Sequence, residues 1–203
     1  MRLDIRGSYL DAMCFLKRNK AKFLLLLFLC IIVAIFGIIH ATIIREITRE
    51  CIHRYNVFRV LSRNRGFFGY YFSRIAVITI TLLGITLFGF RKLFAPVSIV
   101  ILLFYTHQTF FMIGGIFVYS TVVVFPVMLV GVVPLALINL FFIISYATFV
   151  FSTSSNYQVC KFSDLGIYYR TVLPVFGVLK ILIAIAVLLE AALIFLLRLG
   201  ITL

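Results

Sequence analysis

The stretch from Leu93 to Cys160, LFAPVSIVILLFYTHQTFFMIGGIFVYSTVVVFPVMLVGVVPLALINLFFIISYATFVFSTSSNYQVC, contains no Asp, Glu, Lys or Arg. A membrane-spanning helix needs about 20 consecutive apolar residues, so this stretch has room for about two or three crossings. Because the lipid interior offers no water to backbone groups, continuous apolar segments must be helical there. A transmembrane barrel would alternate apolar and polar residues, and this stretch does not alternate. The sequence therefore predicts an all-α polytopic transmembrane helix bundle.

The composition of the whole 203-residue chain agrees with this class. Hydrophobic residues make up 64% of the chain and charged residues only 12%, whereas a soluble domain must present a polar surface to water. Nineteen Lys and Arg against six Asp and Glu give a net charge of +13. The basic residues flank the apolar runs, which fits contact with anionic lipid headgroups better than contact with nucleic acid. We therefore expect membrane lipids, and no nucleic acid, among the partners.

Apolar runs bounded by charged residues predict five spans in one transmembrane domain of residues 23–203. Residues 1–22 are basic and amphipathic, as in a helix that lies in the membrane interface. An Arg-rich loop, residues 45–74, follows the first span. The expected spans are residues 23–44, 75–90, 95–113, 126–151 and 171–197.

The segment from Ile116 to Phe151 is too long for one crossing. We favour a re-entrant or interfacial stretch at residues 116–125, followed by one span that Pro134 kinks because proline removes a backbone hydrogen bond. Two full spans are the alternative. The orientation is weakly determined, because six basic residues precede the first span and seven lie in the next loop. The later loops tip the positive-inside rule slightly toward a cytoplasmic N-terminus.

No residue pattern indicates catalysis or metal binding. The three histidines, His40, His53 and His107, are far apart in sequence, and none has a carboxylate at metal-ligand spacing. The HExxH, GxSxG and Walker-type motifs are absent, and the four cysteines form no CxxC motif. We expect a protein without enzyme activity, cofactor or metal.

A few polar residues lie inside the apolar runs, where burial is costly and indicates a role. Glu190 is the only acidic residue deep within an expected span, and it predicts either a contact between helices or subunits, a protonatable site, or a neutral, packed carboxylic acid. His107, in the third expected span, is its predicted partner. Lys180 is expected to extend its side chain to the interface, and Asn139 to hydrogen-bond between helices.

Glycines and prolines mark where helices can approach closely. We predict that membrane helices of partners dock in grooves formed at these residues, and that the Arg-rich loop makes a second contact. The residues expected in these contacts are Gly84, Gly89, Pro126, Pro134, Arg54 and Arg59.

Specific residues resemble the stage II sporulation protein M family. Leu83-Gly84-Ile85 to Gly89, followed by Pro96-Val-Ser-Ile-Val-Ile-Leu-Leu, is similar to the second and third spans of that family. Val123-Val-Phe-Pro126 and Val133-Pro134-Leu-Ala-Leu-Ile resemble its Phe-Pro and later Pro, and Leu189-Glu190-Ala191 resembles the Glu-Ala of its last span. The chain departs from the family at His107-Gln108-Thr109 and Val127-Met128, so it resembles a divergent member.

The resemblance implies a non-enzymatic scaffold in the mother-cell septal membrane of a spore-forming bacterium. Such a scaffold anchors stage II sporulation proteins D and P, which degrade septal peptidoglycan during engulfment. The residues alone leave a second class open, a permease subunit for a small solute. In that case Glu190, His107 and the proline-broken fourth span would form a site at the membrane midplane.

Overall fold

The structure of the chain is a computed structural model that describes residues 17–43, 66–90, 93–119, 128–156 and 162–201. These residues form helices, in the order α2 (Lys20–Ile43), α5 (Phe67–Gly89), α6 (Ala95–Tyr119), the π-helical turn η1 (Met128–Val132), α8 (Val133–Asn156) and α9 (Phe162–Ile201). Five helical segments are long and apolar enough to cross a membrane. The predicted all-α polytopic bundle is confirmed, and its five apolar helices are those of a multi-pass membrane protein.

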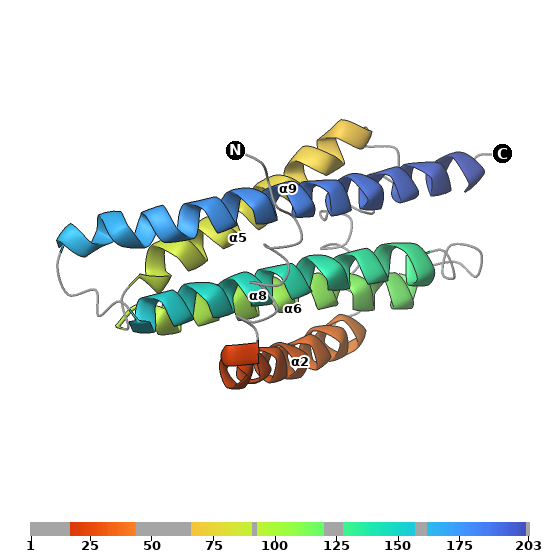
Figure 1. The fold of residues 1–203 in the computed structure, drawn as a ribbon. Helices are drawn as coiled ribbons and strands as arrows, with labels where there is room; N and C mark the ends of the chain where they lie inside the picture. The colour runs from red at the N-terminus through yellow and green to blue at the C-terminus, as the bar shows by residue number, and fades with distance from the viewer. Residues whose placement is uncertain (1–16, 44–65, 91–92, 120–127, 157–161, 202–203) are drawn as a thin grey trace.

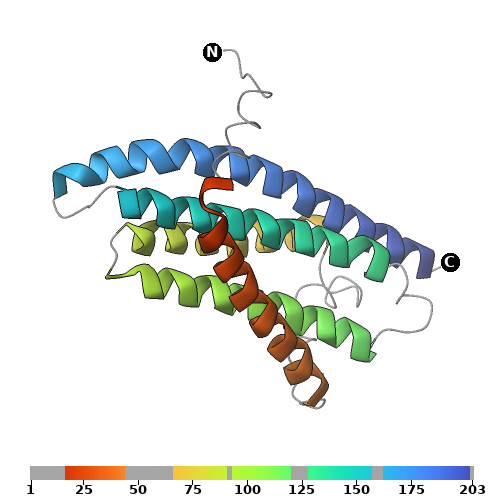
Figure 2. The ribbon, with the colours of Figure 1, turned by 60° about the horizontal axis from the view of Figure 1, so that its bottom comes forward.

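Four of the helices, α5, α6, α8 and α9, run side by side, and α2 crosses them obliquely on one face (Figures 1 and 2). The start of α5, the end of α6, the start of α8 and the end of α9 lie toward the same end of the bundle (Figure 1). We call this the Phe67 end, and the opposite end the Gly89 end. Successive helices therefore alternate in direction, as the spans of a polytopic protein must.

Helix α2 packs on α6 through a contact that only small residues allow. A Cβ atom added to Gly37 would lie 2.8 Å from the backbone oxygen of His107, and one added to Gly114 would lie 2.9 Å from the Cβ of Ala41. Close backbone approach at small residues is the usual way for membrane helices to gain packing energy without a hydrophobic driving force. The buried residues of α2 share one face: Leu26, Cys30, Ala34, Gly37 and Ala41.

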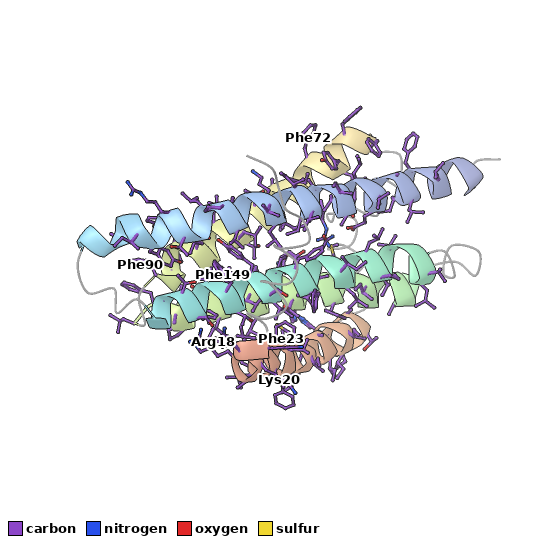
Figure 3. All side chains as sticks on the ribbon, in the orientation of Figure 1. Arg18, Lys20, Phe23, Phe72, Phe90 and Phe149 are labelled. Carbon is purple, nitrogen blue, oxygen red and sulfur yellow. The ribbon has the colours of Figure 1, made fainter. Side chains whose placement is uncertain are left out.

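At the Gly89 end, side chains from three helices interlock. The Thr86 and Tyr146 hydroxyls lie 2.5 Å apart, and the Tyr168 hydroxyl donates to the Thr86 backbone oxygen at 2.9 Å. Gly89 packs directly against Val150, where a larger residue would collide. These contacts join α5, α8 and α9, and Phe149 lies among the side chains between the helices (Figure 3).

The second span begins earlier than the sequence predicted. Helix α5 starts at Phe67, so residues 67–74 belong to a membrane helix and not to the Arg-rich loop. The sequence-based boundary at Ile75 was set by Arg74, which was interpreted as a residue at the headgroups. Phe72, in the second turn of α5, is 63% exposed and extends outward, as aromatic residues near an interface do (Figure 3). Residues 1–16 and 44–65 lie outside the described residues.

The other helix ends also differ from expectation. Helix α6 continues to Tyr119, so residues 116–119 are not part of a re-entrant stretch, and α9 begins at Phe162 instead of Thr171. Residues 120–127 are not described. The segment that follows contains one candidate span, Leu129–Ser154. The irregularity expected from Pro134 occurs just before it, as the π-helical turn η1, which is a common cause of bends in helices.

Candidate functional site

Glu190 lies in the interior of the bundle, on the buried face of α9. Its side chain is 1% exposed, between Val187 and Ile194, which are fully buried. The Tyr70 hydroxyl donates a hydrogen bond of 2.5 Å to Glu190 Oε1, and Arg74 Nε lies 3.6 Å from the same oxygen. The contact therefore combines a hydrogen bond with an ion pair, and it ties α9 to α5.

Helix geometry explains why one carboxylate meets both partners. Tyr70 and Arg74 are four residues apart on α5, so their side chains lie on the same face, one turn above the other. Tyr105 of α6 is also buried close to Arg74 and Glu190. Three helices thus contribute to one buried polar cluster, which we call the α5–α9 cluster: Tyr70, Arg74, Tyr105 and Glu190.

The α5–α9 cluster contains both buried charges in the described part of the chain. Arg74 is 8% exposed, and a charge removed from water in this way is costly unless an opposite charge compensates it. Arg74 and Glu190 compensate each other. The sequence singled out Glu190 but missed Arg74, because a basic residue at the edge of an apolar run is indistinguishable from a residue at the headgroups.

The predicted pairing of Glu190 with His107 is wrong. His107 Nε2 lies 3.4 Å from His40 Nδ1, and both rings lie against the ring of Phe111. The close contact at Gly37 brings α2 to this side of α6, so the histidine pair forms at the α2–α6 crossing and the carboxylate pairs elsewhere.

Asn139 is fully buried in α8, and neither its amide oxygen nor its amide nitrogen has a hydrogen-bond partner among the described residues. The contact between helices that the sequence predicted for Asn139 is therefore not seen as a hydrogen bond. Glu190 Oε2 also lacks a hydrogen-bond partner there. The interior therefore contains polar atoms, on Asn139 and Glu190, that could form further hydrogen bonds.

The predicted docking grooves are filled at the two glycines by the chain itself. A Cβ atom on Gly84 would lie 3.0 Å from Ile101, and Gly89 packs against Val150. Both glycines therefore serve the internal packing of α5. Pro134 is exposed near the start of α8. The remaining predicted contacts, Pro126, Arg54 and Arg59, lie outside the described residues.

The chemistry of this site is that of a fixed ion pair. Among the described residues, no three His, Cys, Asp or Glu side chains come together as a metal site would require.

No protein-family model, no curated protein and no solved structure matches the chain. The fold and the site together define a multi-pass helical membrane protein with an internally compensated charge.

Proposed function

We propose that the protein is a non-enzymatic integral membrane scaffold. The observation that carries this proposal is the pairing of Arg74 with Glu190. These are the two buried charged residues among the described residues, and each compensates the charge of the other inside the bundle. Ionisable groups inside membrane helices often mark a pathway for ions or protons, where they exchange partners during transport. A buried pair that is also held by Tyr70 serves instead to fix one helix arrangement.

The surface of the bundle suits a scaffold. Helices α2 and α9 each bury only 22% of their most apolar stretch within the chain. Their outer faces carry large apolar side chains, including Phe28 at 60% and Ile181 at 63% exposed. Such faces meet either lipid or the membrane helices of other proteins. A rigid bundle with two largely uncovered helices therefore has the surface that a membrane anchor for other proteins requires.

The resemblance to the stage II sporulation protein M family supplies the class of partner. We propose that the partners are membrane-anchored peptidoglycan hydrolases of the stage II sporulation D and P type, held at the septal or engulfing membrane. Wall hydrolases act outside the membrane and need an anchor within it. The scaffold supplies the anchor, and the partners supply the chemistry.

Affinity capture of the tagged full chain from its native membranes in mild detergent tests this proposal. We expect membrane-anchored wall-degrading proteins to be recovered together with the chain, and to be absent when an unrelated five-span protein is captured in the same way. Recovery of a nucleotide-binding ATPase subunit instead would contradict the scaffold and identify a permease.

A permease subunit is the second candidate, and one observation favours it. The amide of Asn139 is buried without a hydrogen-bond partner among the described residues, as a group that binds a polar solute would be. A transport role predicts that Asn139→Leu abolishes solute uptake while the protein stays folded. A purely structural role predicts unchanged or greater stability, because the substitution removes an unpaired buried polar group.

A further inference from the structure

Lys180 is exposed on α9, and two contacts fix its depth in the bundle. The Tyr168 hydroxyl donates to the backbone oxygen of Thr86, and Tyr70 of α5 donates to Glu190. Lys180 lies about midway between Tyr168 and Glu190 along α9. On α5, the point midway between their partners Thr86 and Tyr70 is the middle of the helix. It is therefore level with about the middle of α5, whose ends are Phe67 and Gly89.

This depth is too great for the side chain to reach the headgroups. At a rise of about 1.5 Å per residue, the middle of α5 lies about 16 Å from either end of that helix. A lysine side chain has a four-carbon stem and reaches about 6 Å. The sequence alone predicted that Lys180 would reach the interface, because it placed the start of the helix at Thr171. The helix begins nine residues earlier, at Phe162, so Lys180 lies deeper than expected.

The face around Lys180 is apolar and open. Leu173 and Leu188, about two turns before and after Lys180 on the same side of α9, are 53% and 44% exposed, and a Cβ atom added to Gly177 would meet nothing within 4 Å. Gly177 lies one turn before Lys180, so a neighbouring helix can approach the backbone of α9 closely at this point. A cation on such a face, surrounded by lipid alone, would be strongly unfavourable.

We propose that this face of α9 binds a transmembrane helix of another protein that carries a carboxylate at mid-membrane depth, opposite Lys180. An Asp or Glu there compensates the ammonium group, as Glu190 compensates Arg74 inside the bundle. The described side chains of a second copy of this chain do not supply that carboxylate. In the part of the chain whose side chains the structure describes, Glu190 is the only acidic residue, and it is buried and already paired. The inference rests on the scaffold function and names the chemistry of its partner.

The test uses the full chain in phosphatidylcholine vesicles at neutral pH, with a donor fluorophore on a C-terminal tag. The probes are two single-span Leu/Ala peptides with an acceptor fluorophore, identical except for a central Glu or Gln. Energy transfer measured against peptide density gives the association of each peptide. We expect the Glu peptide to associate at least tenfold more strongly than the Gln peptide.

Three variants locate the effect. Lys180→Met should reduce the ratio between the Glu and Gln peptides to about one, and Lys180→Arg should retain it. Arg170→Met, which removes another exposed basic side chain of α9, should leave the ratio unchanged. Both side chains are exposed, so the three variants should remain folded, which circular dichroism and monodisperse elution would verify.

Equal binding of the two peptides to the wild-type chain would overturn the proposal, and would show that Lys180 is satisfied by lipid headgroups or water. A ratio that survives Lys180→Met would also overturn it. The scaffold function is judged separately by capture from native membranes. If wild type and Lys180→Met recover the same hydrolases, the scaffold stands and the docking face is wrong. If capture fails while the peptide ratio holds, the docking face stands and the hydrolase scaffold is wrong.

Discussion

Replacing Glu190 by Gln changes the charge at the α5–α9 cluster and almost nothing else. Gln has the same shape as Glu, and its side-chain oxygen can still accept the hydrogen bond from Tyr70. The variant removes the negative charge that lies 3.6 Å from Arg74 Nε. Arginine does not give up its proton in proteins, so Glu190→Gln leaves an unpaired cation buried in the bundle.

The structure sets the size of the expected effect. Two unit charges 3.6 Å apart attract each other by about 4 to 5 kcal/mol at an effective dielectric constant of about 20. Breaking a buried pair by removing one partner typically costs about 3–5 kcal/mol. We therefore expect Glu190→Gln to lower the free energy of unfolding by about 3–5 kcal/mol. The double variant Arg74→Met/Glu190→Gln should recover most of this loss, since it removes both charges.

Reversible unfolding in mixed micelles of increasing SDS fraction measures these free energies. Energy transfer between labels at the ends of α5 and α9 reports the separation of the two helices. A Glu190→Gln protein within about 1 kcal/mol of wild type would refute the reasoning, because it would mean that the carboxyl group is neutral and not paired with Arg74. A double variant no more stable than Glu190→Gln would refute it as well.

Three further predictions follow from other contacts. Gly37→Ala should destabilise the fold by about 1–3 kcal/mol in the same unfolding assay, because the added Cβ would lie 2.8 Å from a backbone oxygen of α6. The control variant Gly177→Ala should be neutral or slightly stabilising, because the space around Gly177 is open. Tyr146→Phe should cost about 1 kcal/mol, since it removes one buried hydrogen bond to Thr86; a cost near zero would contradict that contact. Thiol labelling of intact cells should leave buried Cys30 unreactive. It should also place Cys51 on one side of the membrane, and Cys14 and Cys160 on the other. Labelling of these three cysteines from the same side would contradict the topology.

The helices were predictable from sequence because the lipid interior offers no water to backbone groups, so a continuous apolar segment must satisfy its backbone hydrogen bonds within a helix. Their ends were less predictable. Phe67 to Ser73 are aromatic or weakly polar, so composition alone does not decide whether they form a loop or the first two turns of α5. Residues 162–170 contain Asp164 and Arg170, so composition indicated a loop there, whereas they form the first turns of α9.

The α5–α9 cluster was only half predictable. A single acid within an apolar run is conspicuous, so Glu190 could be identified from sequence. Its partner depends on which faces of α5 and α9 meet, and a list of apolar runs contains no such information. His107 was chosen because it lies near the middle of the third expected span. Helix α2 crosses α6 at Gly37, and this crossing brings His40 into contact with His107. The crossing also depends on tertiary packing.

The most direct test of the central claim, that Arg74 and Glu190 form an ion pair inside the bundle, is solid-state NMR of the protein in lipid bilayers. A dipolar-recoupling experiment would measure the distance from ¹⁵N-labelled Arg74 Nε to ¹³C-labelled Glu190 Cδ. We predict a separation below about 5 Å, consistent with the ion-pair distance of 3.6 Å, and a carbon shift in the carboxylate range. An undetectable coupling, or a carbon shift in the range of a protonated acid, would contradict the claim.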